Sequence, residues 1–331
     1  MVNNMGAGAD QPVTTAATAI KKAKGRTGNP FRALLKYHAL WILALPGILL
    51  LLINNYMPMF GIFLAFKSLN FSKGIWGSDW VGFDNFKFLF ATNDIWRIIA
   101  NTVLYNIAFI VINTALSVLL ALLLNEVRSK VLSKFFQSSM LLPHFISMVV
   151  VAYLVFGFLN PDLGFINKAI LEPSGHEAVS WYMSPKYWPY ILIIVNSWKS
   201  VGFGSIIYLA TIVGIDKEYY EAAMIDGAGK WKQMTKITVP FLIPIMIILT
   251  LLSIGRIFNA DFGLFYQVTM NSGMLKDVTE VIDTYVYNAL LVSGDTDLAS
   301  SAGLLQSVIG FILVVSVNMI VKRVSSDKAL F

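Results

Sequence analysis

The sequence predicts an all-α membrane protein that crosses the bilayer six times. Apolar residues make up 56% of its 331 residues and charged residues only 13%, which is about half the charged share of a soluble domain. Six segments are long and apolar enough to cross a hydrocarbon core of about 30 Å, which takes roughly 20 helical residues. A polar and basic interruption at 215–239 separates two of these segments. Together these observations favour a polytopic helical membrane protein.

The six predicted spans follow one another along the chain from residue 38 to residue 321. They are His38 to Phe66, Ile98 to Leu124, Phe135 to Leu159, Trp188 to Gly214, Pro240 to Phe262 and Ala302 to Val321. Pro58 is expected to kink the first span, because proline removes one hydrogen bond of a helix. The stretch before Phe31 has no apolar core, so we expect the first span, and not a cleavable signal peptide, to direct insertion.

The charges of the connecting segments predict the orientation of the chain. Basic residues concentrate in the segments that share one side if both termini are cytoplasmic, which the positive-inside rule favours. These sixteen of the twenty-five Lys and Arg residues are Lys21, Lys22, Lys24, Arg26, Arg32, Lys36, Arg128, Lys130, Lys134, Lys217, Lys230, Lys232, Lys236, Lys322, Arg323 and Lys328. Residues 1–37 and 322–331 are therefore predicted to be cytoplasmic tails. The loop at 215–239 is predicted to lie on the same side.

This loop has the sequence of two short helices joined by a tight turn. Glu218 to Asp226 favour a helix, and Gly227 offers the positive φ that ends one. Gly229 to Lys236 can form a second helix before Pro240. The loop is therefore predicted to be a compact elbow that presents one face to a partner.

The residues of the elbow resemble a known motif. Glu221, Ala222, Ala223, Asp226, Gly227 and Ala228, followed by Ile237-x-x-Pro240, are similar to the EAA loop of ABC importer permeases, although Met234 stands where an aromatic is commoner. The resemblance implies an ABC importer permease fold whose loop couples to a cytoplasmic ATPase. It also implies a second permease subunit, two ATPase subunits that carry ATP and Mg, and an extracytoplasmic solute-binding protein. The expected location is a bacterial cell membrane.

A second resemblance concerns the substrate. The segments 55–61, 65–67, 74–78 and 80–86, the run 281–287 and the terminal Ala329-Leu330-Phe331 are similar to permeases that import oligosaccharides and polysaccharide fragments, including alginate and pectin fragments. The resemblance implies an oligosaccharide substrate. The aromatic segment from Trp80 to Phe90 is equally open to a contact with the binding protein and to a place in an interfacial aromatic belt.

Ionisable and polar residues within the spans are candidates for the substrate pathway, because such residues are costly in a membrane and mark functional sites. The candidates are Trp198, Lys199 and Phe203 in the fourth span, and Arg256 and Asn259 on one face of the last turns of the fifth. Aromatic rings cover the C–H faces of sugars, and cations bind carboxylates. Arg256 is alternatively expected to pair with Asp261 or with a partner subunit. Gly202 and Gly204 are expected to allow close packing of helices or, alternatively, to open the backbone to the pathway.

Several other classes of protein fit less well. The chain has no cysteine, and His38, His144 and His176 are far apart, so we expect neither a metal site nor an enzyme. Gly227-Ala228-Gly229-Lys230 lacks the earlier Gly and the following Ser or Thr of a phosphate loop. Basic residues are spread over the loops beside spans, which favours lipid headgroups over nucleic acid. A secondary transporter or channel remains the main alternative, and a membrane scaffold is a third.

Overall fold

The computed structural model describes residues 37–324; residues 1–36 and 325–331 lie outside the described part. The expected tails, 1–37 and 322–331, therefore fall almost wholly outside it. The chain divides into two units, Met1–Phe60 and Gly61–Phe331.

The first unit contains the beginning of the first predicted span. Helix α3 (His38–Leu51) is followed by a π-helical turn η1 (Leu52–Tyr56) and by the 3-10 helix η2 (Met57–Phe66), whose last residues belong to the second unit. The whole stretch His38–Phe66 is long and apolar enough to span a membrane. The irregularity predicted at Pro58 begins earlier, at Leu52, because the proline lacks the N–H that would extend the α-helical ladder back to Asn54.

The second unit opens with a small folded segment. Strand β1 (Lys67–Ser68) pairs antiparallel with β2 (Asp79–Trp80) around α4 (Gly74–Gly77), and α5 (Asp84–Ala91) follows. Lys67 is buried, and its ammonium donates to the carbonyls of Ile75 and Trp76 at 2.9 and 3.1 Å. The same ammonium lies 5.0 Å from the ring centroid of Trp80. These contacts satisfy the buried charge and hold the turn of this segment together.

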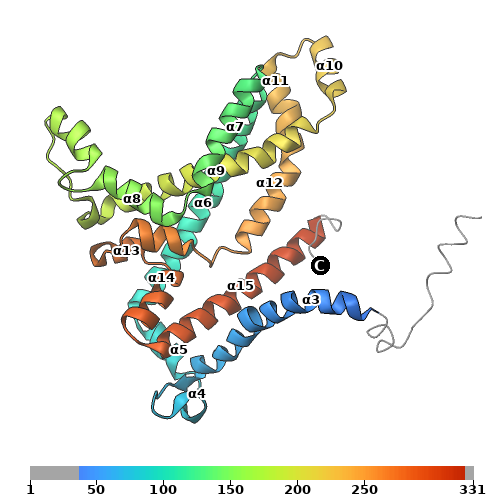
Figure 1. Ribbon diagram of the computed structural model, residues 1–331. Helices are drawn as coiled ribbons and strands as arrows, with labels where there is room; N and C mark the ends of the chain where they lie inside the picture. The colour runs from blue at the N-terminus through green and yellow to red at the C-terminus, as the bar shows by residue number, and fades with distance from the viewer. Residues whose placement is uncertain (1–36, 325–331) are drawn as a thin grey trace, which may run out of the picture. The chain divides into compact units, whose positions relative to one another are not determined.

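Two long helices, α6 (Asn93–Asn125) and α9 (Trp188–Val213), pack side by side at the centre of the second unit (Figure 1). Their contact is polar in the middle: the Asn113 amide donates to Asn196 at 2.8 Å, and the Ser197 hydroxyl donates to Asn113 at 2.8 Å. A Cβ on Gly202 would overlap the backbone carbonyl of Met140, and one on Gly204 would overlap Ser117. The close helix packing expected at the two glycines is therefore confirmed.

The third predicted span is not one continuous helix. It consists of α7 (Lys130–Phe145) and α8 (Met148–Leu159), which are bent by 97° at the residues between them (Figure 1). Pro143 stands near the end of α7, and the Ser147 side chain caps α8 by accepting from the Val150 amide at 3.4 Å. The sequence prediction of a span from Phe135 to Leu159 did not include this sharp bend. With this bent pair counted as one span, the described part of the chain contains six candidate spans.

The connection from α8 to α9 is built of short helical turns. They are η3 (Ile166–Leu171), η4 (Glu172–Ser174), η5 (Trp181–Met183) and η6 (Pro185–Tyr187). Buried Asn167 organises this loop, because its amide nitrogen donates to the carbonyls of Pro161 and Val179, and its oxygen accepts from the Trp181 indole at 2.9 Å.

The fifth span ends earlier along the chain than expected. Helix α12 (Val239–Ile254) ends before Gly255, and the next turns are held by bonds to the third residue back, including Asn259 N–H to the Arg256 carbonyl at 2.8 Å. Arg256 and Asn259 thus lie beyond the helix, and their predicted place on its last turns was wrong. A Cβ on Gly255 would lie 3.3 Å from Val314 of α15 (Thr296–Val324), so the chain leaves the helix where it meets α15.

The segment between α12 and α15 is irregular. Its elements are η8 (Gly263–Val268), η9 (Gly273–Leu275), α13 (Lys276–Thr279), α14 (Ile282–Tyr287) and η10 (Asn288–Val292). Leu264 and Phe265 of η8 join a buried core with Tyr105 of α6, Val151 of α8 and Leu192 of α9. A second core joins α6, α9 and α12 through residues that include Leu124, Ile212 and Leu242.

Candidate functional site

The elbow (residues 215–239) begins with a helix that is capped at both ends by local contacts. Helix α10 (Lys217–Ile225) starts at Asp216, whose carboxylate accepts from the Glu218 amide at 3.1 Å. It ends at Gly227, which has φ +74°, with hydrogen bonds from Ala228 N–H to the Ala223 carbonyl and from Gly227 N–H to the Met224 carbonyl at 2.8 and 3.0 Å. This is a Schellman motif. The predicted helix and its glycine stop are confirmed.

The second half of the elbow leads directly into the fifth span. Helix α11 (Lys230–Gln233) continues through the π-helical η7 (Met234–Thr238) into α12. Buried Gln233 donates to the Ala228 carbonyl at 2.8 Å, and the hydroxyls of Tyr220 and Thr238 are hydrogen-bonded at 3.0 Å. The first bond holds α11 to the turn after Gly227, and the second joins α10 to Thr238, the residue before α12.

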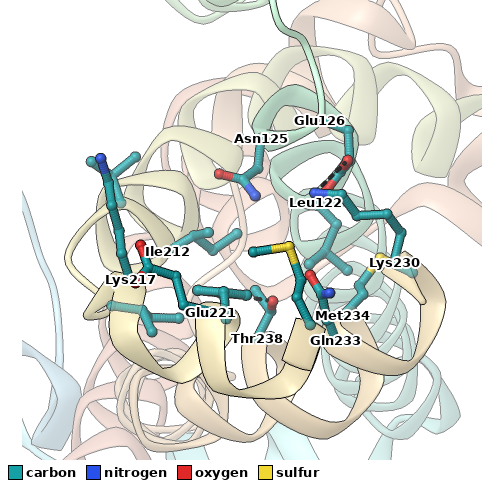
Figure 2. A pocket seen from close by; sticks show the side chains of 14 residues that line it. Leu122, Asn125, Glu126, Ile212, Lys217, Glu221, Lys230, Gln233, Met234 and Thr238 are labelled. Carbon is teal, nitrogen blue, oxygen red and sulfur yellow. Dashed lines mark hydrogen bonds and ion pairs between the residues drawn. The ribbon is translucent and has the colours of Figure 1, made fainter. Parts of the chain in front are cut away.

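A pocket of about 410 Å³ lies behind the elbow (Figure 2). Glu221 of α10 and Gln233 of α11 line one side of it, and Asn125 and Glu126, at the end of α6, line the other. Lys230 reaches across to Glu126, with the ammonium 3.6 Å from the carboxylate. The pocket therefore sits where the elbow meets the ends of α6 and α9.

The elbow leaves large apolar side chains uncovered on the described chain. Ile225 is 87% exposed, Trp231 74% and Met224 57%, on either side of the Gly227 turn. Isolated apolar side chains are normal on protein surfaces, but several in one short segment mark an interaction site. Glu221, Ala222, Asp226 and Gly227 are exposed as well, whereas Ala223 and Ala228 are half-buried. The elbow therefore presents a surface that suits a partner protein.

The candidate pathway residues do not all meet in one place. Phe203 and Arg256 line a common pocket of about 390 Å³ between α6, α9 and α12, called the bundle pocket below. Trp198 lines a different pocket of about 690 Å³, which is mainly apolar and lies between α6, α7 and α9. Asn259 lines neither of these two pockets and contacts Gln306 of α15.

Lys199 lies at the break of the third span. Its ammonium donates to the carbonyls of Pro143 and His144 at 3.3 and 3.0 Å and also to that of Ile146. These carbonyls belong to the end of α7, where a helix leaves carbonyls unpaired and carries a partial negative charge. Lys199 is half-buried and caps α7 from a neighbouring helix. This geometry favours a structural role over contact with a substrate.

One polar network was not predicted from the sequence. The Gln306 amide nitrogen donates to the Phe258 carbonyl at 2.8 Å and to the oxygens of Asn259 and Asp283, both at 3.2 Å. Asp283 also accepts from the Ala260 amide at 2.8 Å, and burial raises the pKa of its carboxyl group. Gln306 thus fixes the turn after α12 to α14. An amide inside the apolar sixth span was the signal available in the sequence.

The comparisons with known proteins agree with this geometry. Residues 113–326, more than half of the chain, match the family model described as the inner membrane component of binding-protein-dependent transport systems. The chain belongs to this family. The matched range includes the elbow and the bundle pocket of the permease. Transport permeases, and not enzymes, make up the family, and the chain is a membrane-embedded member of it.

Two relatives and one solved structure resemble the permease over most of their length. The protein LplB of Bacillus subtilis is 35% identical over 96% of each chain. The polygalacturonan/rhamnogalacturonan transport system permease protein YteP of the same species is 34% identical over 89% of this chain and 91% of its own. A chain in the crystal structure of a bacterial ABC transporter involved in the import of the acidic polysaccharide alginate superimposes with a TM-score of 0.80, at 33% identity, over 90% of this chain and 100% of that one. The predicted ABC importer permease fold is confirmed.

Proposed function

We propose that this permease forms one half of the transmembrane pathway of an ATP-driven importer for oligosaccharides or polysaccharide fragments. The observation that carries the proposal is the elbow, which is joined by hydrogen bonds to the start of α12 and exposes Ile225, Met224 and Trp231 to a partner. The names of the relatives support the substrate class, since YteP is named for polygalacturonan and rhamnogalacturonan and the solved transporter for alginate.

The proposed complex contains four further protein chains of three kinds. A second permease subunit completes the pathway, two cytoplasmic ATPase subunits bind ATP and Mg, and a solute-binding protein delivers the saccharide from outside. The alginate transporter has been solved in complex with an alginate pentasaccharide-bound periplasmic protein, which supports a binding protein as partner. ATP-driven closure of the ATPases would act on Glu221 to Ala228. Through α10 and α12 this movement would switch the pathway between inward-open and outward-open states.

The proposed orientation places the elbow and both termini in the cytoplasm of a bacterial cell. The four lysines of the elbow, Lys217, Lys230, Lys232 and Lys236, are all exposed. Exposed basic residues beside spans are retained on the cytoplasmic side, where anionic lipid headgroups attract them. This orientation brings the uncovered apolar residues of the elbow to the side on which an ATPase is found.

Uptake by proteoliposomes tests the proposal against the secondary-transporter alternative. The complete complex is reconstituted and given a labelled pectin or alginate fragment, with the binding protein on one side and ATP and Mg on the other. We expect uptake only when the binding protein and ATP are both present. Uptake that an ion gradient drives in the absence of ATP would instead support a secondary transporter.

A further inference from the structure

We propose that Arg256 binds the carboxylate of an acidic sugar residue in the bundle pocket, and that it thereby selects acidic over neutral saccharides. The inference rests on the proposed function, because it gives one residue of the pathway a role in choosing the cargo. It starts from a comparison of the two cations that the sequence places within or at the end of spans, Lys199 and Arg256.

The two cations differ in how their charge is satisfied. Lys199 is half-buried and donates to three backbone carbonyls of the α7 end. Within residues 37–324, by contrast, no Asp or Glu carboxylate lies within 4.0 Å of the Arg256 guanidinium, and its side chain makes no hydrogen bond. Arg256 lies just beyond the end of α12 and is exposed. Arg256 therefore has donors available for a ligand.

The acid expected to neutralise Arg256 is engaged elsewhere. Asp261 lies five residues further along the chain, and its carboxylate accepts from the Leu264 amide at 3.1 Å, at the start of η8. Asp283, the next nearby acid in the turn region, is bound to Ala260 and Gln306. The Arg256–Asp261 ion pair considered from the sequence is not formed in the structure. An arginine with no acid nearby suits an anion that comes and goes.

The walls of the bundle pocket have the chemistry of a sugar site. Hydroxyl groups come from three helices, with Thr114 and Ser117 on α6, Ser200 and Tyr208 on α9, and Ser253 on α12. A pocket of about 390 Å³ lies within the range of small-molecule sites. Hydroxyls exchange hydrogen bonds readily with those of a saccharide, because each is both donor and acceptor.

An aromatic face and a fixed amide complete the pocket. The Phe203 ring is stacked on His144, with 4.6 Å between the ring centroids and an 11° angle between the planes, and it remains 46% exposed. Asn113 is held by Asn196 and Ser197, so this wall is preorganised. A sugar ring stacked on Phe203 would lie in the pocket that Arg256 also lines, and the planar guanidinium of arginine binds carboxylates with two parallel hydrogen bonds.

The test compares an acidic saccharide with its neutral counterpart. Oligogalacturonates and their methyl esters of equal length are offered to complexes with wild-type permease, Arg256→Gln and Arg256→Lys. For Arg256→Gln we expect kcat/KM of uptake to fall at least about tenfold for the acid and less than about twofold for the ester, because only the carboxylate loses a charged partner. Arg256→Lys should recover part of the loss, since lysine keeps the charge but not the planar fork.

The outcomes separate the inference from the proposed function. Equal losses for acid and ester, no loss for either, or failure of Arg256→Gln to assemble would overturn the role of Arg256. In the last case the arginine would be structural. If the wild-type complex imports neither saccharide with ATP and binding protein present, the proposed function itself fails and the inference fails with it. ATP-driven import of both, with no change in Arg256→Gln, would overturn the inference alone.

Discussion

Two of the breaks between helices of this permease differ in kind, one between α7 and α8 and the other in the elbow at Gly227. At the first break a side chain from another helix, Lys199, satisfies the free carbonyls of α7, and Gly202 brings the backbones of α9 and α7 together. At the second, the chain caps itself through the left-handed Gly227 and leaves Ile225 and Trp231 exposed. The first break, called the joint below, is held by contacts with another helix. The second forms part of the exposed surface of the elbow.

The two breaks are therefore stabilised in different ways, one by tertiary contacts and the other by local hydrogen bonds. The joint depends on tertiary contacts, so changes to it should act on folding and assembly. The elbow is held by hydrogen bonds within the short segment Asp216 to Thr238. Changes to its exposed residues should leave the fold intact and act on a partner. Substitutions at each break can therefore contradict the comparison.

The largest effect is expected from Gly202→Ala. The added Cβ would overlap the backbone carbonyl of Met140, and a backbone cannot move aside as a flexible side chain can. Overpacking of this kind costs about 1–3 kcal/mol, or more where the backbone must shift. We expect a severalfold or greater loss of folded permease in detergent, measured by fluorescence-detected size exclusion.

Gly157→Ala is the matched control for that variant. Gly157 lies in α8, and a Cβ there meets nothing within 4 Å in the described structure. Its yield should equal that of the wild type. Equal yields of Gly202→Ala and wild type would show that α9 and α7 do not pack as closely as described.

A smaller effect on folding is expected from Lys199→Met, because removing a charge from within a span relieves a cost that offsets part of the lost hydrogen bonding. Methionine keeps the length of the side chain but leaves the carbonyls of Pro143, His144 and Ile146 without the ammonium, and a hydrogen bond to a charged group is worth about 1.5–3 kcal/mol. The thermal midpoint of the purified complex should fall, and Lys199→Arg should restore part of it. An unchanged midpoint combined with lost uptake would instead make Lys199 a pathway residue, as the sequence first suggested.

The sequence predicted the elbow better than the joint. Helix-forming residues before Gly227 and an apolar run after Pro240 are local signals, and local hydrogen bonds alone close this turn, so the structure follows from the nearby sequence. The joint depends on Lys199, more than fifty residues from the carbonyls that it binds. Pro143 was visible within the span, but a proline can also kink a helix that continues. Whether such a helix breaks depends on which helix packs beside it.

The candidate pathway residues were also predicted only in part from the sequence. That Phe203 and Arg256 line one pocket follows from the packing of α9 against α12, which periodicity within a single helix does not reveal. The early end of α12 at Ile254 follows from the contact of Gly255 with α15 and from Gln306 on the turn beyond. The residue type alone predicted that Arg256 could bind an anion. Only the tertiary structure shows that Lys199 binds backbone carbonyls, whereas the side chain of Arg256 has no such partner in the described part of the chain.

The measurement that tests the coupling role of the elbow most directly is ATPase stimulation by the loaded binding protein in nanodiscs, with Ile225→Asp in the permease. Ile225 is 87% exposed, so the substitution should leave folding unchanged. Val131→Asp is the matched control, because Val131 is 79% exposed in the first turn of α7, outside the elbow, where an acidic residue is tolerated. We predict at least a tenfold loss of stimulation for Ile225→Asp and stimulation near the wild-type level for Val131→Asp. Full stimulation of Ile225→Asp would contradict the account.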